Sequence, residues 1–366
     1  MNVSKLAPLA LALSMSALFT TGCKKPDADG SAEGSASAAA SAEKPKKPKR
    51  KKNDDSPVVK LAEKVVKECK WEKGWFDNDC KADDEWREKQ NDLLDEGKAD
   101  ADLLSMLPDE RPAMRYLAAE ALSSYGEKYK EDAALAGEIF DAAEVEKDEY
   151  VLAALGGTLA RVDYAKTKLV ARAKQLMKDD ANAKMRAQFF SNVGFHNRED
   201  QSVENELRDL TLSAASASDN ALRAAVMRGL GSFDPNDKVC AAWTKGMADP
   251  KKEVVEAALD RAPSKCTSTF DAVIAATEKT DKPVFSFWYP RALVEVCSKG
   301  TADQKTKAQK LAEEIANTSK SSASRGDALR AVAACDAEAG KALAKKLSKD
   351  ENEFVRKEAE KILKGS

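Results

Sequence analysis

The stretch DNALRAAVMRGLGSF, residues 219–233, opens with an acidic and an amide residue and then places Leu222 directly before Arg223. Six further segments resemble it, and most repeat its order of a polar opening residue, an apolar residue, an arginine and then small residues. They are PAMRYLAAEALSSYG (112–126), DEYVLAALGGTLARV (148–162), NAKMRAQFFSNVGF (182–195), KEVVEAALDRA (252–262), GDALRAVAACDA (326–337) and EFVRKEAEKIL (353–363). The apolar marker residues are Met114, Val151, Met185, Leu222, Val254, Leu329 and Val355.

The markers recur at nearly constant spacing. The first four intervals are 37, 34, 37 and 32 residues, and the gap of 75 after Val254 leaves room for two units. An atypical copy, KPVFSFWYPRALVEVC (282–297), lies in that gap, and the last interval of 26 is short, as terminal units often are. Each marker follows another segment with helical spacing, such as YAKTKLVARAKQLM (164–177), and no segment after Val58 alternates with period two. The pattern therefore predicts an all-α repeat of two helices.

A two-helix unit of about 35 residues with this opening resembles the HEAT repeat and its bacterial HEAT-like variants, which include chromophore lyases. The resemblance covers roughly residues 87–364, about eight units, and implies a right-handed α-solenoid whose stacked pairs bury one continuous core. It departs from the family at Leu152 and Val255, where arginine is expected, and at the aromatic-rich unit 282–298. A tetratricopeptide array has a similar period and is the alternative, but its Trp, Tyr and Pro positions do not recur here in phase.

The recurring acid and arginine have two interpretations. In the structural one, the acid caps the helix start and the arginine pairs with an acid in the same or the next unit. In the functional one, some of these arginines contact a ligand, because the second helix of each HEAT unit usually lines the concave face.

The N-terminus predicts export. The apolar run from Leu6 to Phe19 has 14 residues, fewer than the roughly 20 that a membrane span needs, and it follows Lys5, as in a signal peptide. Its end, Thr20-Thr21-Gly22-Cys23, resembles the lipobox of bacterial lipoproteins, although Thr20 stands where a leucine is expected. The resemblance implies a signal peptide at 1–22, acyl chains such as palmitate on Cys23, and, because Lys24 follows, the periplasmic side of the outer membrane rather than the inner membrane. Cleavage by an ordinary signal peptidase is the alternative.

Seven cysteines leave one unpaired in an oxidising compartment, and lipidation of Cys23 would leave six that can pair. Cys69 and Cys80 are 11 residues apart across a glycine-containing turn, and Cys297 and Cys335 are 38 apart, about one repeat. We place the latter two at matching positions on adjacent helices, five or six residues after Arg291 and Arg330, and we place Cys240 and Cys266 where the first helices of neighbouring units begin. These placements predict the disulfides Cys69–Cys80, Cys240–Cys266 and Cys297–Cys335. The alternative for the last pair is two small buried core residues.

The remaining regions differ in composition. Residues 23–57 lack aromatic side chains and predict a disordered Ala/Ser/Lys-rich linker, whose basic run Lys44–Lys52 is either a solvated spacer or a contact to an anionic surface. Residues 58–86 hold Trp71, Trp75 and Trp86 and predict an N-terminal cap, with a recognition patch as the alternative. Residues 87–366 form the repeat domain. Because the body is mildly acidic, no nucleic-acid partner is predicted.

The sequence favours binding over catalysis. It has one histidine, His196, and neither a C-x-x-C pair nor a catalytic motif, so we predict no catalytic residues, metal site or cofactor. Phe287, Trp288, Tyr289 and Arg291 have the composition of an interface and are predicted to bind a partner, unless they fill a bend where Pro290 interrupts the helix. The predicted function is a membrane-anchored, non-enzymatic scaffold that binds an envelope protein of unknown identity. The alternatives are an enzyme or enzyme subunit of the HEAT-like lyase type and a tetratricopeptide-like adaptor.

Overall fold

The computed structural model describes residues 50–77, 79–94, 97–178, 180–195, 197, 199–280 and 286–365. Helices contain most of these residues and one short hairpin contains the strands, which confirms the predicted all-α class. No helix in these ranges is both long and apolar enough to span a membrane. The elements are α1 (Pro57–Glu68), β1 (Trp71–Glu72), β2 (Trp75–Phe76), α2 (Lys81–Leu94), α3 (Asp100–Met106), α4 (Pro112–Tyr125), α5 (Lys128–Glu131), α6 (Ala133–Val145), α7 (Glu149–Leu159), α8 (Tyr164–Thr167), α9 (Val170–Leu176), α10 (Ala183–Asn192), η2 (Val193–Phe195), α11 (Gln201–Ser213), η3 (Ala214–Ser216), α12 (Asn220–Leu230), α13 (Asp237–Gly246), α14 (Lys252–Lys265), η4 (Thr267–Thr269), α15 (Phe270–Lys279), α16 (Trp288–Lys299), α17 (Ala302–Thr318), α18 (Ser322–Cys335), α19 (Ala337–Leu347) and α20 (Glu353–Lys364).

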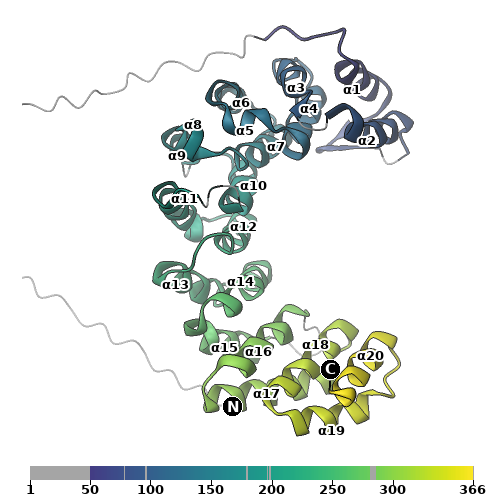
Figure 1. Ribbon diagram of the computed structural model, residues 1–366, viewed down its shortest axis with the longest axis vertical. Coiled ribbons are helices and arrows are strands. Elements are labelled where there is room, and N and C mark those ends of the chain that lie inside the picture. The colour runs from purple at the N-terminus through teal and green to yellow at the C-terminus, as the bar shows by residue number, and fades with distance from the viewer. Residues whose placement is uncertain are drawn as a thin grey trace, which may run out of the picture. The chain divides into compact units, whose positions relative to one another are not determined.

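From α3 onward the helices form consecutive pairs, with the short helices α5 and α8 placed before α6 and α9. We call the second members of these pairs the second helices: α4, α7, α10, α12, α14, α16, α18 and α20. Each second helix packs against the second helix that follows it along the chain. The first members make their own contacts, for example α3 with α6, α11 with α13 and α15 with α17, and Figure 1 shows the two sets side by side.

The end of the predicted linker is ordered, so the prediction of disorder up to residue 57 is wrong for residues 50–57. Arg50 donates two hydrogen bonds to Glu138 of α6, and Lys52 pairs with Glu63 of α1. Ser56 caps α1 and Pro57 occupies its first turn. Two members of the Lys44–Lys52 run therefore contact acidic groups of the fold itself, while residues 44–49 lie outside the described part of the chain.

The predicted cap consists of α1, the hairpin and α2. Phe76 and Trp86 are buried in it, and α1 packs against α2. The predicted boundary at residue 86 falls inside α2, which continues to Leu94, so the cap ends with that helix.

A tight turn orients the hairpin. Lys73 and Gly74 both have positive φ, at 51° and 80°, as the two central residues of a type I′ turn require. A Cβ atom on Gly74 would lie 2.7 Å from the Tyr150 ring, so glycine also lets the turn approach α7 closely. Cys69 and Cys80 join the two chain segments that flank the hairpin.

Arginines tie successive pairs together. Arg115 donates two hydrogen bonds to Glu146, Arg223 to Asp249 and Arg325 to Asp350, each acid lying just before the next second helix. Each guanidinium also donates to two backbone carbonyls before its own helix, as Arg325 does to Ser319 and Lys320. We call Arg115, Arg223 and Arg325 the arginine ladder. For these three arginines the structure favours the structural interpretation of the acid and arginine pattern.

One register prediction is wrong. Arg115, Arg223 and Arg325 each lie four residues after the N-cap residue of their helix. Arg330, taken from GDALRA as the repeat arginine of α18, lies five residues further on and contacts Asp327 and Glu358 instead. The reason is that Ser321 caps α18 more than one turn earlier than the sequence motif suggests, so Asp327 is a buried residue inside the helix and not a cap.

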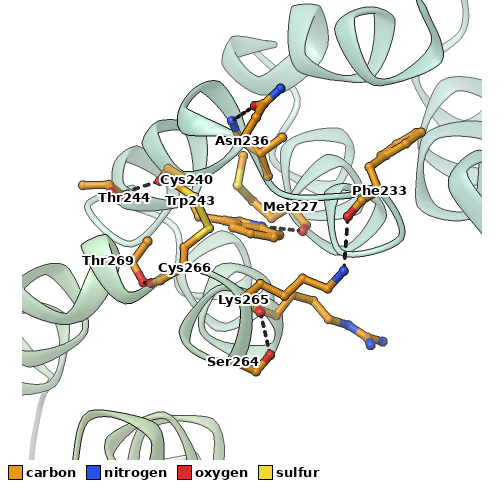
Figure 2. Close-up of a disulfide and its surroundings, with 12 residues drawn as sticks. Met227, Phe233, Asn236, Cys240, Trp243, Thr244, Ser264, Lys265, Cys266 and Thr269 are labelled. Atoms are coloured by element: carbon orange, nitrogen blue, oxygen red, sulfur yellow. Dashed lines mark hydrogen bonds between the residues drawn. A yellow bond between two sulfur atoms is a disulfide. The ribbon is translucent and has the colours of Figure 1, made fainter. Parts of the chain in front are cut away.

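The six cysteines of the described chain form the three predicted pairs. Their Cα atoms are 5.6 Å apart in Cys69–Cys80, 5.8 Å in Cys240–Cys266 and 4.4 Å in Cys297–Cys335. Cys240 lies in the first turn of α13 and Cys266 caps the end of α14, just before the next pair (Figure 2). Beside this bond the buried Trp243 donates its indole N–H to the Met227 carbonyl at 2.9 Å.

The prediction that Cys297 and Cys335 occupy matching positions on their two helices is wrong. Cys297 lies ten residues after the N-cap of α16, whereas Cys335 is the last residue of α18, fourteen after its N-cap. The two helices pack together closely enough for the bond to form across this offset of one turn.

Replacing Cys297 and Cys335 together by alanine is expected to lower the free energy of unfolding by about 3–4 kcal/mol, because the crosslink restrains a 38-residue loop in the unfolded chain. Equilibrium urea unfolding measures the change, and reduction of the parent protein should lower the free energy of unfolding further, because it breaks all three disulfides. Free thiols at these positions in a non-reducing peptide map would contradict the pairing.

Acid should destabilise the protein. A hydrogen bond from Arg111 lowers the pKa of Glu63 to about 2, and a bond from Arg223 lowers the pKa of Asp249. Since both folded pKa values lie below those of unfolded chains, near 4, the stabilisation is present above about pH 4–5 and is lost as the pH falls toward the folded values. The raised pKa values of Asp100 and Glu120 act in the opposite direction, but more carboxyl groups have a lowered pKa, among them Asp109, Glu146 and Asp350. Urea unfolding between pH 7 and pH 3 tests this, with a shallower decline expected for Glu63→Gln. Equal stability across that range would contradict it.

Candidate functional site

A recess with a volume of about 320 Å³ lies between the hairpin and the second helices α4, α7 and α10. The elements that form it come from three successive pairs and from the cap. Its lining residues are Lys73, Gly74, Trp75, Tyr116, Glu120, Ser123, Ser124, Tyr150, Ala153, Ala154, Gly157 and Gln188.

Aromatic rings form its walls. Trp71 packs behind them, with its ring centroid 6.1 Å from that of Tyr116 and 6.5 Å from that of Tyr150. Trp75 stands on the opposite face of the hairpin from Trp71, because cross-strand pairing places Trp71 with Phe76 and Trp75 with Glu72. Trp75 is 73% exposed, the largest fraction among the large apolar side chains of the described chain. The fold thus holds an indole ring in solvent beside two half-buried tyrosines.

Small side chains form the floor. Ser123 of α4 lies opposite Ala153, Ala154 and Gly157 of α7 in the lining. A Cβ atom on Gly157 would lie 3.4 Å from the Ser123 hydroxyl and would meet no other group so closely. The floor is therefore open enough for another chain to approach the helix surfaces.

Charged groups surround the recess. Burial among protein atoms raises the pKa of the Glu120 carboxyl, Arg87 opposes this rise and Asp83 adds to it. Glu120 is nevertheless open to solvent, because it lies in a concave surface rather than in the core. Burial also raises the pKa of the Tyr116 hydroxyl to about 12, with Glu120 contributing, so this tyrosine is neutral and can donate a hydrogen bond at physiological pH. The cation of Lys184 lies 4.0 Å from the Tyr150 ring centroid and pairs with Glu149.

The structure separates the predicted partner-binding residues into two places. Phe287 and Trp288 pack with ring centroids 4.4 Å apart and ring planes tilted by 38°, and the Arg291 guanidinium lies 5.8 Å from the Trp288 ring centroid. Tyr289 is only 3% exposed, lines a second recess of about 390 Å³ and hydrogen-bonds to Thr280. Pro290 does not interrupt a helix, since α16 begins at Trp288 and the proline lies in its first turn.

The predicted lipidation site, Cys23, and the histidine His196 both lie outside the described residues. In the part of the chain that the structure covers, no three His, Cys, Asp or Glu side chains gather closely enough to hold a metal ion.

Of the residues that line the recess, the sequence indicated only Trp75 as a candidate for recognition. The signal that could have indicated the recess is the WEKGWF stretch, where a two-residue glycine turn must place its tryptophans on opposite faces of a hairpin. The partners Tyr116, Tyr150 and Gln188 carry no such local signal.

Comparison with known proteins identifies no relative that informs the site. No protein-family model and no curated protein matches the chain. Among solved structures, a crystal structure of an engineered protein matches with 17% sequence identity and a TM-score of 0.27, covering 72% of this chain and 94% of the other.

Proposed function

We propose that this protein is a lipid-anchored, non-enzymatic scaffold of the bacterial cell envelope, built as a right-handed HEAT-type solenoid whose second helices present a binding surface to another protein. The observation that carries the proposal is the recess, whose lining combines the exposed Trp75 with two half-buried tyrosines and a floor of small residues. Exposed aromatic side chains beside polar groups are typical of protein interfaces. The adjoining side chains of Phe287, Trp288 and Arg291 offer a second anchor on the same set of helices.

Site-specific photo-crosslinking in cells tests the scaffold proposal. A photoreactive residue in place of Gln188, beside the recess, or of Phe287 should crosslink to the same envelope protein. The matched control is Glu206 on α11, an exposed residue of a first helix, where no such product is expected. Identical products from all three positions, or none from the first two, would contradict a binding surface on the second helices. Alanine at Phe287, Trp288 and Arg291 should also weaken capture of that protein without loss of helical circular dichroism.

Anchoring is tested separately. The mature protein is expected to begin at Cys23 and to carry acyl chains, because the small residues Thr21 and Gly22 precede this cysteine and a polar linker follows it. Intact-mass analysis of detergent-extracted protein measures the mass. Cys23→Ser should abolish both cleavage at this site and membrane retention. A mature mass without acyl chains, or a different N-terminus, would remove the lipid from the proposal.

A further inference from the structure

We propose that the recess binds an extended, proline-containing segment of a partner protein in the polyproline II conformation, with a lysine or arginine of that segment placed against Glu120. The inference rests on the proposed scaffold function and names the class of ligand that the site accepts.

The spacing of the helices that carry the aromatic walls supports this ligand. Tyr116 and Tyr150 belong to the successive second helices α4 and α7, and packed helices lie about 8–10 Å apart. A polyproline II helix advances about 3.1 Å per residue with three residues per turn, or about 9 Å per turn. Residues i and i+3 of such a segment therefore repeat at about the spacing of the two helices that carry these tyrosines. Grooves that recognise proline-rich segments are lined with aromatic rings in the same way.

The shape of the recess favours a chain over a single compact group. The lining runs across three second helices, from Glu120 on α4 past Gly157 on α7 to Gln188 on α10. Its small-residue floor lets a ligand backbone approach, and Gln188 and Ser124 offer hydrogen bonds to the carbonyl groups that a polyproline II segment leaves unpaired. The backbone that carries Trp75 needs little ordering on binding, because the Lys73-Gly74 turn and the Cys69–Cys80 bond constrain the hairpin.

The charge of the site supports a basic residue in the ligand. Arg87 is bound to Asp83 at 2.8 Å, and Lys184 is bound to Glu149 at 2.8 Å. No ion pair of the described chain includes Glu120, which leaves one carboxylate in the recess for a ligand cation. Lys73, also in the lining, lies on the hairpin turn and disfavours a second cation at that side.

The test uses fluorescence anisotropy with the mature protein and a labelled peptide of nine prolines followed by arginine. We expect it to bind at least about tenfold more tightly than a glycine-serine peptide of equal length and charge. Trp75→Ala should weaken binding by at least about tenfold, and Gly157→Trp, which fills the floor, should do the same. Phe195→Ala removes an aromatic side chain that is 53% exposed and absent from the lining, so it serves as the control and should leave the affinity unchanged.

Glu120→Gln provides the test of the charge. It should weaken binding of the arginine-ended peptide severalfold and leave binding of a glutamine-ended peptide unchanged. Thermal melts of Trp75→Ala should match the parent protein, which would show that the loss is one of binding.

Three outcomes would overturn the inference: equal affinity for both peptides, an affinity unaffected by Trp75→Ala, or binding of tetra-N-acetylglucosamine in place of the proline peptide. Failure here is distinguishable from failure of the scaffold function. If position 188 still crosslinks to one envelope protein while the proline peptide does not bind, the scaffold stands and the ligand class is wrong.

Discussion

Gly156→Ala is expected to lower the free energy of unfolding by about 3 kcal/mol, whereas Gly157→Ala should leave it unchanged or raise it by up to about 1 kcal/mol. A Cβ atom on Gly156 would lie 2.3 Å from the Met185 carbonyl oxygen, so α7 and α10 must separate to accept it. On Gly157 the nearest group is the Ser123 hydroxyl at 3.4 Å, an ordinary contact. The same substitution at adjacent positions of one helix thus separates backbone packing from helix propensity.

Equilibrium urea unfolding, followed by far-ultraviolet circular dichroism, measures both variants. Because α7 and α10 are neighbouring second helices, the loss should also appear as faster amide exchange in α10. Equal changes for the two alanine variants would show that helix propensity, and not the contact between α7 and α10, determines the stability at this position.

Arg325→Ala should destabilise the protein by about 3–5 kcal/mol, because it leaves the Asp350 carboxylate and two backbone carbonyls without their donor. Both side chains of this pair are nearly buried, at 10% and 9% exposure. Arg325→Lys should recover only part of the loss, since an ammonium group cannot supply the paired N–H donors of a guanidinium.

The control is Lys307→Ala, which removes an ion pair with Asp303 whose partners are 54% and 74% exposed, and it should change stability by no more than about 0.5 kcal/mol. A double-mutant cycle with Asp350→Ala then isolates the coupling between Arg325 and Asp350. A coupling near zero would mean that the arginine ladder is a surface feature without a structural role.

Features that depend on neighbouring residues could be predicted from the sequence. The 3.6-residue period of apolar positions was enough for the all-α class, and the polar residues that open the repeats act as caps in several helices, such as Asp219 of α12 and Asn182 of α10. The pairing of Cys69 with Cys80 follows from their separation of 11 residues, because a short loop closes easily.

Features that depend on packing could not be predicted in this way. The repeat pattern selects Arg330, which follows the apolar Leu329, but the cap at Ser321 fixes the rotation of α18 and brings Arg325 to Asp350. The same holds for the order at Arg50 and Lys52, whose partners Glu138 and Glu63 are set by how α6 and α1 lie beside the chain. Composition indicated a solvated linker there because it carries no information on distant acids.

The recess depends most on tertiary structure. The sequence determined that a glycine turn would separate Trp71 from Trp75, but not that Trp75 would stand beside Tyr116 and Tyr150. Those tyrosines belong to different helices, and each by itself fits a half-buried core position as well as a binding wall. The close approach of Gly74 to Tyr150 decides between a core position and a binding wall. It holds the hairpin against α7 and leaves the Trp75 indole ring in solvent.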